Sequence, residues 1–456
     1  MISLTVLPAL LYIPGTQPFR IPIRVAGYGI ALAALAYWWT RWRHARPHYV
    51  PHPAVPWLIV AIAYLVVMLM HPETNSLASG LAQIGLYLSV LAPVFWAPKL
   101  VESPDRLRRI LWLLLICNGI SSLVGVMQVR DPDRWMPSEF SSAILSKDKY
   151  LDSLTYKGPD GRKIVRPPGL GDAPGAVCGA GAFALFLGLA FIAIGRNLKV
   201  RVTAAVLATL GAAALFLTLV RSSFIVAVAM IILYILLLIW QRRFVTAGIM
   251  IAISTAIIAG AFTYAYFLGG ENILLRFFSI INDDPTTFYY KNRGSQVEQA
   301  FWTLLPTYPF GAGLGRWGMM YFYFGDGYNL LSPPIHVEIQ WPAWIIDGGI
   351  FFLIIYPIAI IMTIKANVTL IRLPRDRQIQ DIVAIILSAN VGLLALIFSY
   401  PVFCSISGMQ FWFLAGALHG LAQRMGVGVG KRPLLAPVFE PGPASGRARC
   451  GTERHQ

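Results

Sequence analysis

The stretch VTAAVLATLGAAALFLTLVRSSFIVAVAMIILYILLLIW (202–240) decides the fold class. It is one apolar run, interrupted at its middle by Arg221-Ser222-Ser223. A helix needs about 20 consecutive apolar residues to cross the hydrocarbon core of a bilayer, so each half of the run is long enough. The stretch therefore predicts two transmembrane helices joined by a tight hairpin at Arg221.

The rest of the chain has the composition of a membrane protein. Of its 456 residues, 57% are hydrophobic and 13% are charged, whereas a soluble domain carries about 25% charged residues. This composition excludes a water-soluble enzyme and predicts an all-α, polytopic integral membrane protein. We expect about 12 transmembrane helices, the first of them at the N-terminus in place of a removable signal peptide. The predicted crossings lie near 1–14, 22–40, 55–70, 77–97, 109–129, 174–194, 202–220, 222–240, 244–268, 341–364, 380–400 and 402–423.

The net charge of +16 is mostly a topology signal. Cytoplasmic connections of membrane proteins are rich in Lys and Arg. Placing both termini in the cytoplasm puts more than half of the 37 basic residues on that side. This orientation leaves two long loops, 130–173 and 269–340, outside the cytoplasm. Nucleic acid is therefore not needed as a partner to explain the basic excess.

The chain is predicted to divide into a transmembrane domain, 1–424, and a disordered basic cytoplasmic tail, 425–456, rich in Gly, Pro and Arg. Both long loops far exceed an ordinary connection, which indicates function or disorder. Loop 269–340 contains 15 Phe, Tyr and Trp among its 72 residues, so we expect it to be ordered. Aromatic faces suit sugar rings, but they also mark membrane interfaces. YFYF (321–324) fits a helix resting on the bilayer as well.

Two charged residues fall inside or at the edge of predicted crossings, where an ionisable group is costly and is usually kept for function. Arg221 could reach lipid headgroups or bind an anion, and the basic loops beside it favour the anion. Asp347, in WIIDGGIFF (344–352), could pair with a buried arginine or mark the end of the loop.

Arg293 is the next candidate anion-binding residue. The segment NRGSQVEQAFWTLLP (292–306) has apolar residues at helical spacing, which predicts an amphipathic helix that begins at Arg293. Amide groups and the helix dipole favour anions at such a position. The arginine fork can also bind phosphate oxygens bidentately. The alternative is a solvated loop charge.

His336 lies in LSPPIHVEIQWPAWIIDGG (331–349), just before a predicted crossing. Histidine is the side chain best matched to proton transfer near neutral pH. On a strand, Glu338 and Gln340 would share its face. A structural role for this histidine is the alternative.

These segments resemble the O-antigen ligase and O-antigen polymerase superfamily. The resemblance is carried by LTLVRSSF (217–224), PFGAGLG (309–315) and HVEIQWPAWIIDGG (336–349), in that order, and covers roughly 170–360. It implies a fold similar to GT-C-like membrane glycosyltransferases. It also implies a multi-pass protein of the bacterial inner membrane whose active site faces the periplasm.

The resemblance implies metal-independent, inverting transfer of a glycan from undecaprenyl diphosphate to a sugar hydroxyl. Arg221 and Arg293 would then bind the diphosphate, and His336 would activate or orient the acceptor. Arg166, in VRPPGLGDAPGA (165–176), matches a position that is often basic and would also face the donor. Val337 and Glu338 follow His336 where the family often has Asn or Ser and then Leu, so Glu338 is an alternative base.

Three functions stay open from the sequence. A ligase would hand the glycan to an acceptor such as lipid A-core, and a polymerase would extend a lipid-linked chain. The third function, transport of an anionic lipid-linked substrate, predicts charged or broken helices near the middle of the membrane.

Asp131-Pro132-Asp133 has the spacing of a metal-binding pair, but Arg130 and Arg134 flank it. We therefore predict no metal and no cofactor.

Overall fold

The computed structural model describes residues 7–13, 15–42, 50–101, 103–136, 154–157, 163–171, 175–195, 197–282, 284–291, 293–372 and 376–426. Nearly all of the predicted tail, 425–456, lies outside these ranges. The described part is almost entirely helical, as predicted. Its strands, β1 (Thr155–Lys157) and β2 (Lys163–Val165), form one antiparallel hairpin with Tyr156 opposite Ile164.

The helices fall into a bundle and a group of short elements in the connections. The bundle helices are α2 (Arg20–Tyr37), α3 (Val55–Met68), α4 (Leu77–Leu91), α5 (Pro93–Leu100), α6 (Pro104–Arg130), α9 (Val177–Ile194), α10 (Leu198–Leu217), α11 (Arg221–Trp240), α12 (Phe244–Gly269), α18 (Gln340–Arg372), α19 (Arg377–Leu394) and α20 (Ile406–Arg424). The short elements are η1 (Leu7–Tyr12), η2 (Gln17–Phe19), η3 (Trp38–Trp42), α7 (Pro132–Trp135), α13 (Glu271–Asn282), α14 (Pro285–Lys291), α15 (Gly294–Gln299), η4 (Ala300–Leu304), α16 (Leu305–Thr307), α17 (Gly318–Phe324), η5 (Ala395–Phe398) and η6 (Val402–Cys404).

Nine helices of the described chain are long and apolar enough to cross a membrane, which makes the protein a multi-pass membrane protein. They are Ile21–Arg41, Leu77–Leu100, Pro104–Arg130, Val177–Ile194, Leu198–Leu217, Arg221–Trp240, Phe244–Gly269, Gln340–Arg372 and Arg377–Phe398.

Three of the predicted crossings are not among the nine. The prediction at 55–70 corresponds to α3, which is apolar but has only 14 residues. The prediction at 402–423 corresponds to α20, whose buried Gln410 and His419 make it more polar than a lipid-facing helix. The described part of 1–14 contains η1, a 3-10 helix of six residues.

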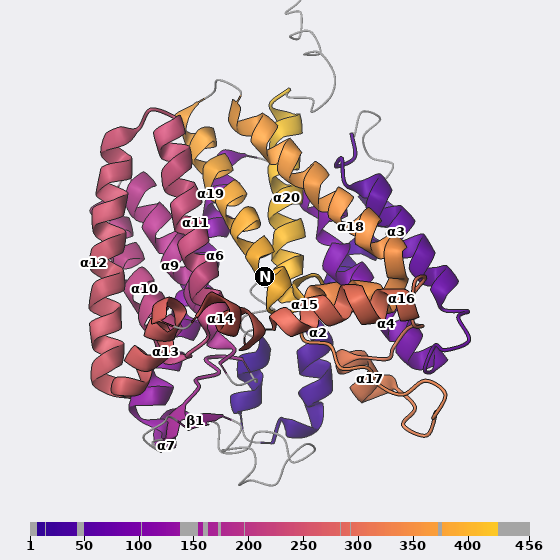
Figure 1. Cartoon of the computed structure of the whole chain (residues 1–456). Coiled ribbons are helices and arrows are strands. Elements are labelled where there is room, and N and C mark those ends of the chain that lie inside the picture. Colours follow the sequence, from indigo (N-terminus) through magenta and orange to yellow (C-terminus); the bar gives the residue numbers. More distant parts are fainter. Residues whose placement is uncertain are drawn as a thin grey trace, which may run out of the picture.

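The bundle helices are arranged in two groups around α19 and α20 (Figure 1). On one side α9 packs against α6 and α10, and α10 packs against α12. On the other side α3 packs against α18, and α4 and α5 pack against α20. The helices α7, α13 and α17, all from the two long loops, lie toward the same end of the bundle. We call this end the loop face.

The predicted hairpin between α10 and α11 is present at the loop face. The turn is formed by residues 218–220, slightly before the predicted break, and Arg221 is the first residue of α11. Leu219 has a φ of 58°, a left-handed conformation that is uncommon for a residue with a side chain. The short turn therefore carries local backbone strain beside Arg221.

Helix α18 is broken near its beginning, at Gly349, which has φ 54° and ψ −144°. The break falls directly after Asp347 and Gly348, so the WIIDGG step is a discontinuity within a membrane-spanning helix. Backbone groups freed by a break inside the hydrocarbon core would need partners in the protein, because water is absent there.

The partners come from PFGAGLG (309–315), which lies against the break. The N–H of Ala312 donates to the carbonyl of Ile346 at 2.7 Å, and the N–H of Ile350 donates to the carbonyl of Pro309 at 2.9 Å. Gly311, with φ 111°, lets the inserted chain turn between them. The two motifs are therefore one structural unit, in which the loop completes the hydrogen bonding of the helix.

Gly349→Ala should destabilise the protein. A Cβ at this position would lie 2.1 Å from the carbonyl oxygen of Pro309, and its φ is unfavourable for alanine. We expect a loss of about 2–4 kcal/mol from backbone strain and overpacking together. Thermal unfolding in detergent would measure it.

The matched control is Gly85→Ala in α4, where an added Cβ meets nothing within 4 Å. Alanine is the better helix former there by about 0.5–1 kcal/mol, so this variant should unfold at or above the wild-type temperature. Equal unfolding temperatures for the two variants would contradict the proposed role of the break.

Candidate functional site

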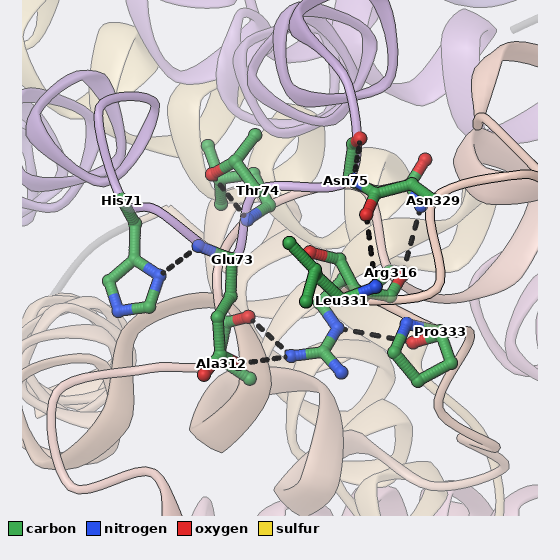
Figure 2. A network of polar contacts seen from close by, with 11 residues as sticks. His71, Glu73, Thr74, Asn75, Ala312, Arg316, Asn329, Leu331 and Pro333 are labelled. Carbon is green, nitrogen blue, oxygen red and sulfur yellow. Dashed lines mark hydrogen bonds and ion pairs between the residues drawn. The ribbon is translucent and has the colours of Figure 1, made fainter.

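The segment after the inserted loop is bonded to the connection between α3 and α4, residues 69–76 (Figure 2). Arg316, only 3% exposed, donates from Nη1 to the Glu73 carboxylate at 2.6 Å and to the carbonyl of Ala312 at 2.9 Å. Its Nε donates to the carbonyl of Pro333 at 3.2 Å. One buried guanidinium thus joins three separate stretches of chain at the loop face.

Asn75 holds the far end of the same segment. Its amide nitrogen donates to the carbonyls of Asp326 at 3.1 Å and Ser332 at 2.9 Å, and its amide oxygen accepts from the N–H of Asp326 at 2.6 Å. The side chain of Asn329 donates back to the carbonyl of Asn75 at 2.8 Å. Residues 311–333 are therefore fixed at both ends.

This framework positions His336. The N–H of Ile335 donates to the carbonyl of Arg316 at 2.7 Å, and residues 333–338 then run without regular structure to the start of α18. The side chain of His336 is 80% exposed and its Nε2 lies 3.3 Å from Oε1 of Glu338. A buried residue, Ile339, anchors the chain directly after this pair.

Glu338 joins His336 to Arg293. Its Oε2 lies 3.1 Å from Nε of Arg293 and accepts from Nε2 of Gln296 at 2.8 Å. Arg293 also donates from Nη1 to the carbonyl of Glu338 at 3.4 Å. We call these four residues, Arg293, Gln296, His336 and Glu338, the His336 cluster. It brings together three of the residues singled out from the sequence.

Arg293 occupies the predicted helix start. It is the N-cap of α15, and α15, η4 and α16 continue from it as far as Thr307. Its φ of 77° is left-handed, a conformation that costs about 1–3 kcal/mol in a residue other than glycine and is often kept at functional sites. The side chain of this N-cap residue thus lies beside Glu338.

The pKa of Glu338 is held below its ordinary value, chiefly because Gln296 donates a hydrogen bond to the carboxylate. Burial opposes this effect, while the positive charge of Arg293 and the contact with His336 add to it. Glu338 is therefore a carboxylate at neutral pH that already has donors. Such a group can orient the imidazole of His336 and stabilise its protonated form.

A second group of basic residues surrounds the turn between α10 and α11. Arg276, in α13, donates from Nε to the carbonyl of Leu219 at 3.3 Å. Gly175 lies close to both Val220 and the guanidinium of Arg166. We use the name basic turn for the turn residues 218–221, which include Arg221, together with Arg166 and Arg276. Burial lowers the pKa of Arg166, and the like charge of Arg276 lowers it further.

Arg166 is held in place by main-chain contacts. Its N–H donates to the carbonyl of Leu154, and its carbonyl accepts from Gly175 at 3.2 Å. Gln128, near the end of α6, bonds the following segment by accepting from the N–H of Gly169 at 2.8 Å and donating to its carbonyl at 3.0 Å. Loop 130–173 thus returns to the loop-face ends of α6 and α9.

The two groups are connected by a single stretch of chain. Arg276 bonds Leu219 in the basic turn and Arg293 contacts Glu338 in the His336 cluster, so α13 and α14 lead along the chain from one group to the other. In Figure 1, α13, α14 and α15 follow one another across the loop face. The loop face therefore carries two groups, guanidinium groups around the turn between α10 and α11 and an imidazole–carboxylate pair directly before α18.

Two other residues considered from the sequence have their partners outside the His336 cluster. Gln340 does not share the face of His336, because α18 begins at this residue and turns its side chain toward Phe403, whose N–H it accepts at 2.8 Å. Asp347 is fully buried and accepts hydrogen bonds from Trp317 at 2.9 Å, Tyr87 at 2.8 Å and Gln83 at 3.0 Å. These neutral donors take the place of the arginine partner considered from the sequence.

Asp131 and Asp133 are both exposed, at the end of α6 and in α7. Across the described residues, no group of three or more His, Cys, Asp and Glu side chains gathers in a way that could hold a metal ion.

Sequence reasoning missed Gln296, Arg276 and Arg316. Gln296 follows Arg293 by three residues, a spacing that places two side chains on one helix face, so the pattern could have indicated it. Arg276, in ILLRFF (273–278), has no comparable signal. Arg316 pairs with a residue 243 positions away, which no local pattern reveals.

Compared with known proteins, the chain matches no protein-family model and no curated protein.

The low pKa of Glu338 predicts a pH dependence of stability. Because the folded-state pKa lies below the unfolded value, the carboxylate stabilises the fold above that unfolded value. The contribution is lost as the pH falls through the folded pKa. We expect the wild type to unfold at a slightly higher temperature than Glu338→Gln near pH 7, and the difference to vanish in acid. The effect is small because the side chain is partly exposed.

Gln296→Ala removes the main cause of the shift, so the acid loss of stability should move toward higher pH in this variant. Thermal unfolding over a pH series would measure all three proteins. An unchanged profile in Gln296→Ala would contradict the assignment of the hydrogen bond as the main cause.

Proposed function

We propose that the protein is a membrane glycosyltransferase of the O-antigen ligase type. It would transfer a glycan from undecaprenyl diphosphate to a sugar hydroxyl at the periplasmic face of the bacterial inner membrane. The reaction would be inverting and would use no metal. The observation that supports this proposal is the contact of Glu338 with both His336 and Arg293 at the loop face.

The basic turn suits the leaving group of this reaction. A lipid diphosphate gains negative charge as its bond to the sugar breaks, and fixed guanidinium groups stabilise that charge. Arg221 and Arg166 would bind the diphosphate, and Arg276 would add a third cation. Arg293 has five N–H donors, of which Glu338 engages some, so it could contact the diphosphate and the acceptor side together.

The His336 cluster suits the acceptor. An exposed imidazole beside a carboxylate can take the proton of an attacking hydroxyl, while the carboxylate orients the ring and stabilises its charged form. Glu338 already accepts from Gln296 and contacts Arg293, and its lowered pKa makes it a weak base. These contacts favour His336 as the base and Glu338 as the residue that positions it.

A polymerase that extends a lipid-linked O-antigen or exopolysaccharide is the second candidate of the same class, because it would use the same groups. A transporter of an anionic lipid-linked substrate is the candidate of another class. The break in α18 is the feature that favours transport, since transporters bind ions at discontinuous helices. Here, however, the broken ends bond to residues 309–312. We therefore favour transfer. The proposed transferase would have about 12 crossings in a GT-C-like arrangement.

The function is tested with purified protein and a defined undecaprenyl-diphosphate oligosaccharide, with and without lipid A-core. Modified core would indicate a ligase, and longer lipid-linked chains would indicate a polymerase. Movement of the unmodified substrate across proteoliposomes would indicate a transporter and would overturn the proposal.

Arg221→Ala and Arg293→Ala should each lower the transfer rate roughly 100- to 1000-fold, as expected for the loss of one group that stabilises transition-state charge. Folding should be retained, because the contact between Arg293 and Glu338 is partly exposed and adds little stability. Arg134→Ala, an exposed arginine in α7, is the matched control and should transfer normally. Wild-type rates in both test variants would refute diphosphate binding by these residues.

His336→Ala should lower the rate roughly 100- to 10,000-fold while donor binding is retained, since general base catalysis contributes on that scale. Glu338→Gln should lose less and should shift the acid limb of the rate profile, because it acts through His336. The pH dependence of single-turnover rates separates the two variants. A larger loss in Glu338→Gln than in His336→Ala would reverse the assignment and make Glu338 the base.

A further inference from the structure

The turn after α17, residues 326–332, exposes three large side chains at the loop face. Tyr328 is 95% exposed, and Leu330 and Leu331 are each 87% exposed. We call these residues the apolar turn. Apolar side chains are seldom presented together in this way to water alone, and a contiguous exposed patch marks an interaction surface.

The exposure is not a consequence of a loose loop. The main chain of the apolar turn is fixed by Asn75, which bonds both Asp326 and Ser332, and by Asn329, which bonds the carbonyl of Asn75. Figure 2 shows this network around Asn75, Asn329 and Leu331. The polar groups of the turn therefore face the protein, and its apolar side chains face outward.

The region has too little charge to attract a strongly charged partner. From Gly318 to Ile335 the sequence has a single charged residue, Asp326. Its carboxylate accepts from the N–H of Tyr328 at 2.9 Å, which holds it at the base of the turn. The surface can thus offer apolar contact and an aromatic hydroxyl, and little electrostatic attraction.

The apolar turn continues the surface of the membrane-spanning helices. Asn75, to which it is bonded, lies in the connection between α3 and α4; Met70 in this connection and Leu77 at the start of α4 are also exposed. Helix α17, which exposes Phe322, packs against α4. Exposed apolar side chains thus lie on the turn, on α17 and on the connection to which the turn is bonded.

We propose that the apolar turn inserts into the membrane leaflet at the loop face. Leu330 and Leu331 enter the acyl region, and Tyr328 lies at the interface, where tyrosine is enriched because its ring is apolar and its hydroxyl polar. The occupant of this surface is lipid. The role is independent of the reaction that the protein performs.

Insertion would fix the depth of the candidate site. The apolar turn is bonded through Asn75 to the connection that also carries Glu73, the partner of Arg316. Arg316 in turn accepts the N–H of Ile335 on its carbonyl, directly before His336. The His336 cluster is therefore held at a set distance from the lipid surface by a short series of hydrogen bonds.

The proposal is tested with an environment-sensitive fluorophore at single cysteines. Leu330→Cys and Tyr328→Cys are made in full-length protein whose native cysteines are replaced by alanine, labelled, and reconstituted into phospholipid vesicles. We expect blue-shifted emission at both positions. We also expect quenching by a lipid nitroxide near the headgroup end of the acyl chain, and protection from aqueous iodide.

Two further positions calibrate the result. Asp133→Cys, exposed in α7, is the aqueous control, and Ala259→Cys, exposed on the membrane-spanning helix α12, is the lipid control. Unchanged thermal unfolding in detergent verifies that each labelled protein is folded. If the turn probes behave like the one at Asp133, insertion is refuted. Protection from both quenchers that is lost as the protein is diluted in lipid would indicate contact between two copies and would equally refute it.

Discussion

The structure depends on one constraint, that backbone groups within a membrane must find partners in the protein. Helix α18 interrupts its own hydrogen bonding at Gly349, within an apolar helix long enough to cross a membrane. The carbonyl of Ile346 and the N–H of Ile350 are satisfied by Ala312 and Pro309. Residues 309–312 must therefore pack against α18 to complete its hydrogen bonding. This packing also fixes the position of the neighbouring residues of loop 269–340.

The candidate site follows from the same return. Once residues 309–312 lie on α18, Arg316 is brought beside Glu73, and its carbonyl binds Ile335. His336 and Glu338 then lie between the framework and the start of α18, within reach of Arg293. The imidazole is exposed while the residues that position it are buried or bonded. A rigid frame that holds an accessible imidazole suits the transfer reaction proposed above.

Much of this arrangement could be predicted locally, and the rest could not. Hydropathy predicted the membrane-spanning helices, Arg221 marked a hairpin, and apolar spacing placed a helix start at Arg293. Such patterns depend on neighbours within a few turns. The break at Gly349 depends on a loop about 40 residues away, and Arg316 depends on Glu73, 243 residues away. Gln340 would share the face of His336 only on a strand, and α18 already begins at this residue.

Asp347 illustrates how charge is divided between the interior and the loop face. A buried carboxylate needs donors, and an arginine could have supplied them, but that arginine would then have been held inside the bundle. Trp317, Tyr87 and Gln83 satisfy the carboxylate without a cation. Arg166, Arg221, Arg276 and Arg293 lie instead in loops, at a helix start or in the connecting helix α13. In the function proposed above, cations at the loop face would meet an anionic substrate without first breaking an ion pair with Asp347.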